Sequence, residues 1–240
     1  MVLKTIKVDG EPKEVTNIRN KILKEFNDLT FVEEGHKYFL NGEQLPSVSE
    51  VTHQFCAYPF VDPYNGHQYV DLGLPSGTKW ATMNVGSTGI TDYGNYYQFG
   101  KGSNTYQTTS GQTNYTGYET PLASSADTAT QVMGGQWHMP TTSQIDELTA
   151  NTTYTWETDF NGSGINGGKF TASNGNYVFF PAAGYYYNGS INGNGSYGNY
   201  WSSISYERKT SSFYLLLVNG SRMKDISQMS GGYSVRGVVG

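Results

Sequence analysis

Glycine and tyrosine are concentrated after residue 60, and this uneven distribution is the strongest constraint on the fold. Only three of the thirty Gly and two of the twenty Tyr lie in residues 1–60. Glycine permits the positive φ angles of tight turns, while tyrosine favours strands and buries a large ring. We therefore predict that the remaining chain forms short strands and tight turns, and not a helical bundle.

Charged residues have the opposite distribution, since 16 of the 35 charged side chains lie in residues 1–60. The dipeptides Tyr58-Pro59 and Asp62-Pro63 mark the end of this charged segment. Proline disfavours helix in the residue before it, so these dipeptides predict an extended connector. We expect a small N-terminal unit over residues 1–62, used for attachment or assembly, and a second domain over residues 63–240.

Within the N-terminal unit, the spacing of apolar residues predicts a short amphipathic helix over Val15–Phe26. The segment Phe31–Gly42 has the pattern strand, turn, strand, turn. Ser47 followed by Glu50 is the pattern of a capping box, which predicts a helix over Val48–Phe55.

In the second domain we predict two strands around a Pro-Ser-Gly turn within Val70–Ala81. Helices are predicted over Ala126–Met133, ended by Gly134-Gly135, and over Thr142–Ala150, with Ile145 and Leu148 on its buried face. Two apolar runs, Val178–Pro181 and Ser212–Val218, are expected as central strands. The predicted core residues are Trp80, Trp137, Trp156, Phe179, Phe180, Trp201 and Val235.

Charge and cysteine content exclude several classes of protein. The net charge of −5 and the absence of a basic run argue against nucleic-acid binding. No apolar stretch is long enough for membrane insertion, and the opening MVLKTIKVDGEPKEV contains no apolar segment of a Sec-type signal. Cys56 is the only cysteine, which excludes an intramolecular disulfide and a multi-cysteine metal site.

One short segment resembles part of an enzyme family. Residues 32–55, which contain YFLNGEQLPSVSEVT, are weakly similar to the opening segment of phage-encoded PD-(D/E)XK nucleases. The metal-binding Asp and Glu-x-Lys of those nucleases do not follow it, so the resemblance does not imply nuclease activity.

A second resemblance covers most of residues 63–240. Six segments occur in order: YVDLGLPSGTKWATMNVG, DYGNYYQFG, GGQWHMPTTSQIDEL, FFPAAGY, GSYGNYWSS and GGYSVRGV. Together they resemble the Fibrobacter succinogenes major paralogous domain, which belongs to the C-type-lectin-like fold group. The resemblance implies an α+β fold with small antiparallel sheets, two helices and long ordered loops. It implies that Thr142–Ala150 is the second helix and that Tyr233–Arg236 lies in a closing strand.

The same fold group contains calcium-dependent lectins and formylglycine-generating enzymes. The lectins need an acid–Pro–Asn or Gln–Pro–Asp tripeptide together with Trp-Asn-Asp, and the sequence has neither. The enzymes need two active-site cysteines, whereas Cys56 precedes this domain. We therefore expect no enzymatic activity, no cofactor, no metal and no calcium-dependent sugar binding.

The fold group also includes the variable proteins of diversity-generating retroelements in gut phages and bacteria. There a reverse transcriptase replaces adenines, so that Asn codons become codons for Tyr, Ser, Asp, Ile and others. Residues 185–230 resemble such a variable region, with framework segments at Gly198–Ser203 and Tyr233–Arg236. The predicted ligand-binding residues are Tyr185, Tyr187, Asn188, Asn192, Asn194, Tyr206, Glu207, Arg208, Lys209, Ser211, Tyr214, Asn219, Ser221, Arg222, Lys224, Asp225, Ser227 and Gln228.

Tyr, Ser, Asn and Gly suit a binding surface, because Tyr has only two side-chain torsions to restrict and the others adapt their hydrogen bonds. The sequence thus predicts a receptor-recognition protein that binds a cell-surface protein or glycan of a host or neighbouring bacterium. We expect it on a phage tail or a bacterial surface, with a homo-oligomer possible. The alternative is an undiversified surface adhesin or structural module exported by a Bacteroidetes-like bacterium.

Overall fold

The chain divides into two compact units, Met1–Val61 and Asp62–Gly240, with the division close to the boundary expected from the sequence. The computed structural model describes residues 64–105, 120–206 and 210–240, together with the backbone of five strands in the first unit. Those strands are β1 (Lys7–Val8), β2 (Glu11–Pro12), β3 (Phe31–Glu34), β4 (Lys37–Leu40) and β5 (Glu43–Leu45).

In the first unit β1 pairs with β2, while β3, β4 and β5 form an antiparallel sheet. This confirms the two strands predicted between Phe31 and Gly42, while the predicted turns lie outside the described residues. The helices predicted over Val15–Phe26 and Val48–Phe55, and Cys56, lie outside the described residues.

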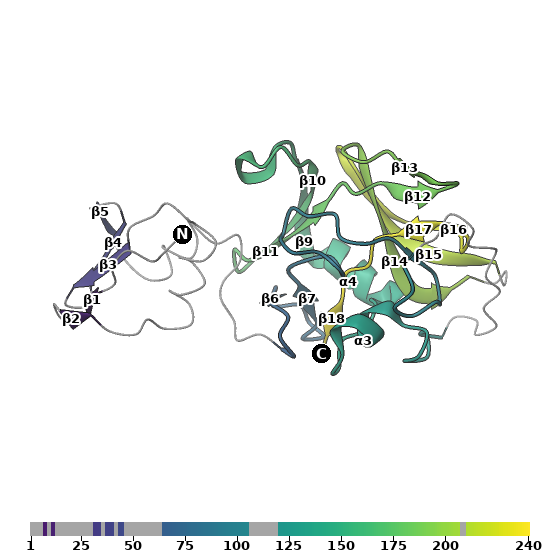
Figure 1. Ribbon diagram of the computed structural model, residues 1–240, viewed down its shortest axis with the longest axis horizontal. Coiled ribbons are helices and arrows are strands. Elements are labelled where there is room, and N and C mark those ends of the chain that lie inside the picture. The colour runs from purple at the N-terminus through teal and green to yellow at the C-terminus, as the bar shows by residue number, and fades with distance from the viewer. Residues whose placement is uncertain are drawn as a thin grey trace. The chain divides into compact units, whose positions relative to one another are not determined.

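The second unit is a mixed α+β structure built from small antiparallel sheets (Figure 1). The first sheet has the order β18-β7-β6, with β6 at Tyr69–Asp71, β7 at Lys79–Ala81 and β18 at Val238–Val239. The second has the order β11-β10-β9, with β9 at Thr152–Glu157, β10 at Gly167–Ala172 and β11 at Tyr177–Pro181.

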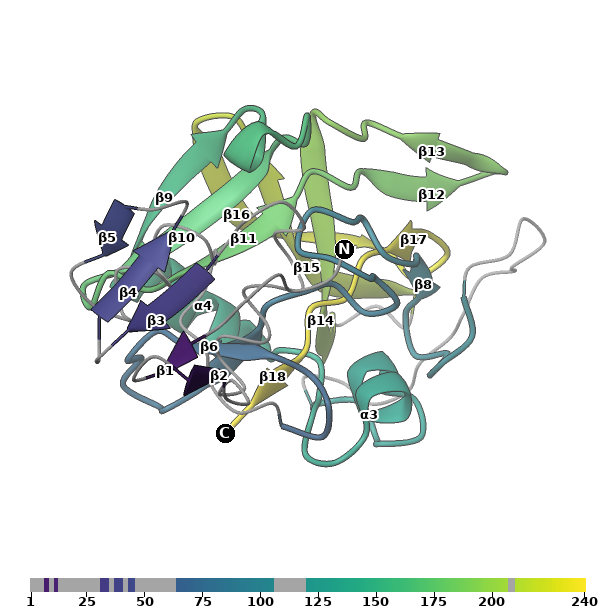
Figure 2. The same cartoon turned by 60° about the vertical axis from the view of Figure 1, so that its left-hand side comes forward.

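The other two sheets lie in the C-terminal part of this unit. One has the order β13-β12-β17-β8, with β8 at Tyr97–Gln98, β12 at Tyr185–Tyr187, β13 at Ser190–Asn192 and β17 at Gly232–Tyr233. The other has the order β14-β15-β16, with β14 at Tyr197–Ser205, β15 at Ser211–Val218 and β16 at Ser221–Gln228. In the view of Figure 2, the β12–β13 hairpin lies on one side of β14 and the β9–β10–β11 sheet on the other.

Two α-helices occur in the described residues of this unit, and both were predicted. Helix α3 (Thr128–Met133) starts two residues later than predicted because the Asp127 side chain caps it, and it ends at Gly134. Helix α4 (Thr142–Asn151) begins with a capping box between Thr141 and Gln144 and buries Ile145 and Leu148. Neither helix is long and apolar enough to cross a membrane.

Two of the strand predictions need correction. Val178–Pro181 was expected as a central strand, but β11 lies at the edge of its sheet. Its residues are apolar because both faces are buried, and an edge position tolerates Pro181, which has no N–H to donate. Tyr233–Arg236 was expected as one closing strand, but β17 ends at Tyr233 and β18 begins at Val238. The other strand predictions are confirmed, since β6 pairs with β7 and β15 is central in its sheet.

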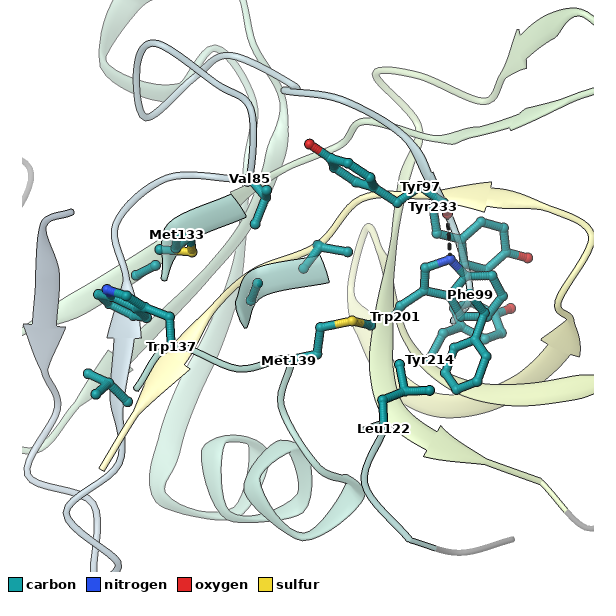
Figure 3. Close-up of a cluster of buried hydrophobic side chains, with 14 of the residues drawn as sticks. Val85, Tyr97, Phe99, Leu122, Met133, Trp137, Met139, Trp201, Tyr214 and Tyr233 are labelled. Atoms are coloured by element: carbon teal, nitrogen blue, oxygen red, sulfur yellow. Dashed lines mark hydrogen bonds between the residues drawn. The ribbon is translucent and has the colours of Figure 1, made fainter. Parts of the chain in front are cut away.

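The core of the second unit is aromatic. Of the seven core residues predicted, six are buried: Trp80, Trp137, Phe179, Phe180, Trp201 and Val235. Trp156 is only half-buried, because it lies on β9, the other edge strand of its sheet. One buried cluster contains Trp137, Met139 and Trp201 and extends to Tyr214 and Tyr233 (Figure 3). The core therefore reaches directly into the C-terminal sheets.

Candidate functional site

A pocket of about 490 Å³ lies between the β12–β13 hairpin and the β14–β15–β16 sheet. We call it the tyrosine pocket. Five tyrosines line it: Tyr185, Tyr187, Tyr197, Tyr214 and Tyr233. The other lining residues are Asn199, Leu216, Val218, Ser227, Gln228, Ser230 and Gly231. Its volume is in the range of about 300–1,000 Å³ that is typical of small-ligand pockets.

Strand register explains why residues far apart in the sequence line the same wall. Directly opposed residues of antiparallel strands project from the same face of a sheet. Tyr197 is opposite Val218, Asn199 is opposite Leu216, and Trp201 is opposite Tyr214. Alternate residues of β14 and β15 therefore form one continuous wall.

The β12 strand forms the opposite wall by the same alternation. Tyr185 and Tyr187 face the pocket, whereas Tyr186 contacts the ring of Tyr96 with centroids 6.0 Å apart. The Tyr185 ring is stacked on Tyr197 at 6.2 Å. The hairpin needs glycine at position 184, where φ is +65° and a Cβ would overlap the carbonyl oxygen of Asn192.

The floor of the pocket is the outer surface of the core. The ring of Tyr233 stacks on buried Trp201 with centroids 4.0 Å apart, and Tyr214 meets Tyr233 edge to face at 5.0 Å (Figure 3). The Trp201 indole N–H donates a hydrogen bond of 2.8 Å to the Tyr97 carbonyl oxygen, which fixes the stack. The rings of Tyr214 and Tyr233 are thus held in place by their contacts with Trp201 and with each other.

Burial favours the neutral form of both floor tyrosines. The Tyr233 hydroxyl donates to Ser227 Oγ at 2.6 Å, and the Tyr214 hydroxyl donates to Asp225 Oδ2 at 3.3 Å. Burial raises the pKa of Tyr233 above its ordinary value, although the hydrogen bonds that its hydroxyl makes with Ser227 and Asn199 partly oppose this. Burial, followed by the neighbouring Tyr233 and the Asp225 carboxylate, raises the pKa of Tyr214. Both are therefore protonated donors at neutral pH.

The lining of the tyrosine pocket contains no Lys, Arg, Asp or Glu among the described residues. Two predicted contact residues that carry charge instead face helix α4 from the other side of β16. The Lys224 ammonium lies 2.6 Å from the Asp146 carboxylate. The Arg222 guanidinium donates to the Thr149 carbonyl at 3.2 Å and lies over the Tyr154 ring. These two side chains dock the sheet on α4.

The structure brings together some of the residues predicted from the sequence. Tyr185, Tyr187, Tyr214, Ser227 and Gln228 line the pocket, and Asp225 contacts it through the Tyr214 hydroxyl. Residues that do not line it are Asn188, Asn192, Asn194, Tyr206, Ser211, Asn219, Ser221, Arg222 and Lys224. Glu207, Arg208 and Lys209 lie outside the described residues.

Other lining residues were absent from the predicted set. These are Tyr197, Asn199, Leu216, Val218, Ser230, Gly231 and Tyr233. Asn199 and Tyr233 had been assigned to the framework segments, and both are buried, yet each also presents atoms to the pocket. Strict alternation along β14 and β15 would have identified Tyr197, Leu216 and Val218.

Over the described parts of the chain, no group of three or more His, Cys, Asp or Glu side chains is arranged to hold a metal ion. Comparisons with protein-family models, with curated proteins and with solved structures found no match to this chain. The function of the protein is therefore inferred from the geometry and chemistry of the tyrosine pocket itself.

Proposed function

We propose that this protein is a non-enzymatic ligand-binding protein that recognises a cell surface through the tyrosine pocket. The proposal rests on one observation: a single pocket is lined by five tyrosines together with uncharged polar side chains. We propose further that the unit Asp62–Gly240 has a C-type-lectin-like fold, to which its α+β architecture and small antiparallel sheets lend support.

The arrangement of the rings favours binding over catalysis. The ring contacts of Tyr185, Tyr214 and Tyr233 restrict these side chains before a ligand arrives, so little conformational entropy is lost on binding. The described residues of the lining include no His, Cys or carboxylate that could serve as a base or nucleophile. The ligand would be a protein or glycan of a host or neighbouring bacterium, met on a phage tail or a bacterial surface.

We also propose that a retroelement diversifies the C-terminal region. Nine lining residues lie in residues 185–230 outside the framework segments, and six of them are Tyr or Ser, which adenine replacement in Asn codons produces. Several outward-facing side chains of β16 are exposed, so substitutions there would change the surface without disturbing the core. The alternative proposal is an undiversified adhesin, in which the same pocket has a fixed sequence.

Binding to whole cells tests the role of the pocket. Tyr187 is 42% exposed and lines the rim, so a Tyr187→Ser variant should fold normally. Loss of an aromatic anchor should weaken binding about tenfold, because such anchors dominate interface energies. Flow cytometry of the labelled full chain on a panel of gut-bacterial cells measures this effect.

The matched control is Lys224→Met, since Lys224 belongs to the predicted binding set but pairs with Asp146 on the α4 side. We expect this variant to bind within about twofold of the unmodified chain, as is usual for surface substitutions. Equal binding by Tyr187→Ser and the unmodified chain would argue against the pocket as the recognition site.

Diversification has a genetic test. The proposal predicts a second, adenine-rich copy of the coding segment for residues 185–230 near the gene, together with a reverse-transcriptase gene. It also predicts that variants from related genomes differ at exposed lining positions such as Tyr187 and Gln228, while Trp201 is unchanged. Absence of the repeat and of the reverse transcriptase would leave the undiversified adhesin as the better proposal.

A further inference from the structure

The uncharged lining of the tyrosine pocket restricts the chemical class of ligand that it can bind. None of its described lining residues is charged. The Asp225 carboxylate accepts a hydrogen bond from the hydroxyl group of the lining residue Tyr214. The nearby cations Arg222 and Lys224 face α4. An anionic ligand would meet a carboxylate and no compensating cation among these groups, so its binding is disfavoured.

The floor contains a hydrogen-bond acceptor in need of a donor. Asn199 is 4% exposed and lines the pocket, and its Oδ1 has no hydrogen-bond partner within the described part of the chain. A buried acceptor without a partner destabilises a protein, and a donor brought to it removes that cost. Oδ1 itself is buried, and the Asn199 side chain is hydrogen-bonded to Tyr233, so a ligand donor reaches Oδ1 only if the amide turns toward the pocket and that bond is given up.

The walls supply aromatic faces and further hydroxyl groups. Tyr185 and Tyr197 bring stacked rings from the two walls, and Tyr233 and Ser227 contribute hydroxyl groups that are hydrogen-bonded to each other. Aromatic faces carry partial negative charge and attract C–H groups, whereas the hydroxyl groups need hydrogen-bond partners. An apolar side chain inserted here would contact the rings but leave Asn199 Oδ1 without a donor.

We infer that the pocket binds an uncharged pyranose unit of a glycan, with C–H groups against the tyrosine rings and a hydroxyl donating to Asn199 Oδ1. This inference rests on the proposed binding function and identifies its ligand class. A pyranose combines an apolar C–H face with a rim of hydroxyl donors and carries no charge. A protein partner is the other possible outcome, and the experiment separates the two.

Saturation-transfer NMR on the full chain tests the inference with four probes: the methyl glycosides of glucose, galactose and mannose, and the anionic sugar N-acetylneuraminic acid. We expect at least one neutral glycoside to receive saturation, most strongly at its ring C–H protons, and the anionic sugar to receive none. Asn199→Leu should weaken binding of that glycoside about tenfold, since it removes the buried acceptor. Tyr187→Ser should also weaken it, which keeps the test decisive if Asn199→Leu does not fold.

The control is Tyr206→Ser, which removes a tyrosine of the predicted binding set that does not line the pocket. It should leave sugar binding unchanged. The inference is overturned if no neutral glycoside binds, if N-acetylneuraminic acid binds equally well, or if Asn199→Leu and Tyr187→Ser both bind normally.

Treatment of the target cells distinguishes failure of this inference from failure of the proposed function. Periodate cleaves the vicinal diols of sugars, and protease removes surface proteins. Cell binding that requires Tyr187 but survives periodate and is lost after protease would contradict a glycan ligand while keeping the pocket as the binding site. Cell binding that does not depend on Tyr187 would contradict the proposed function itself.

Discussion

Replacing Arg236 by Leu is expected to destabilise the unit Asp62–Gly240 by about 3 kcal/mol or more, because it leaves several buried oxygen atoms without donors. Arg236 is 1% exposed, and its guanidinium donates to Asn84 Oδ1, to the Ala81 carbonyl and to the Phe179 carbonyl at 2.9–3.1 Å. It also lies over the Phe180 ring.

These bonds join segments that are distant in the sequence. Ala81 ends β7, Asn84 follows it, and Phe179 lies in β11, so one side chain links two sheets to the C-terminal segment. Lysine carries a single ammonium group and has no planar fork of donors, so Arg236→Lys should recover only a small part of the loss.

Urea unfolding measured by tryptophan fluorescence gives this free energy. All four tryptophans lie in the unit Asp62–Gly240, so the signal reports on that unit alone. The control is Arg222→Leu, which removes an exposed arginine with a single hydrogen bond to Thr149 and should cost about 0.5 kcal/mol or less. Similar losses for the two variants would show that the buried guanidinium does not join the sheets.

Local patterns in the sequence predicted the elements that depend on neighbouring residues. The capping box of Thr141 and Gln144 and the glycine after Met133 set the limits of helices whose hydrogen bonds are internal. The edge position of β11 could not be predicted, because the pairing of strands depends on contacts between distant residues. Val178–Phe180 are buried on both faces of the sheet although β11 is an edge strand. An edge strand that is buried in this way has the same run of apolar residues as a central strand, so the sequence cannot distinguish the two.

The candidate site was predicted less well than the fold, and the reason is geometric. Composition pointed to the region that contains the tyrosine pocket, but not to the face of the sheet on which each side chain lies. Arg222 and Lys224 resemble contact residues by their type, but the register of β15 and β16 places them on the face toward α4. Asn199 and Tyr233 were assigned to the framework through the resemblance to variable proteins, although one side chain can pack in the core and still border a pocket.

The tyrosine pocket is built directly on the core, so a core substitution should affect both stability and binding. Trp201 has no exposed surface, stacks on Tyr233 at 4.0 Å and meets Tyr214 edge to face at 6.3 Å. Trp201→Ala should cost about 3–5 kcal/mol, as is typical when a large buried aromatic side chain is removed. It also leaves the Tyr97 carbonyl without its indole donor.

Trp201→Ala should weaken cell binding by more than the loss of folding stability alone explains. Without the indole beneath it, the Tyr233 ring can sink into the cavity, and its hydrogen bond to Ser227 and its contact with Tyr185 are then broken. Trp201→Phe retains an aromatic surface and should have a smaller effect on both measurements, although it still removes the N–H donor. Unfolding curves, together with cell binding at a temperature where each variant is folded, provide the comparison.

A tryptophan outside the core serves as the matched control. Trp156 is half-buried on the edge strand β9 and does not line the pocket, so Trp156→Ala removes the same atoms from a site that solvent already reaches. It should destabilise the unit less and leave cell binding unchanged. If Trp201→Ala remained folded and bound cells as well as Trp156→Ala does, the stack of Trp201 on Tyr233 would not be what shapes the pocket.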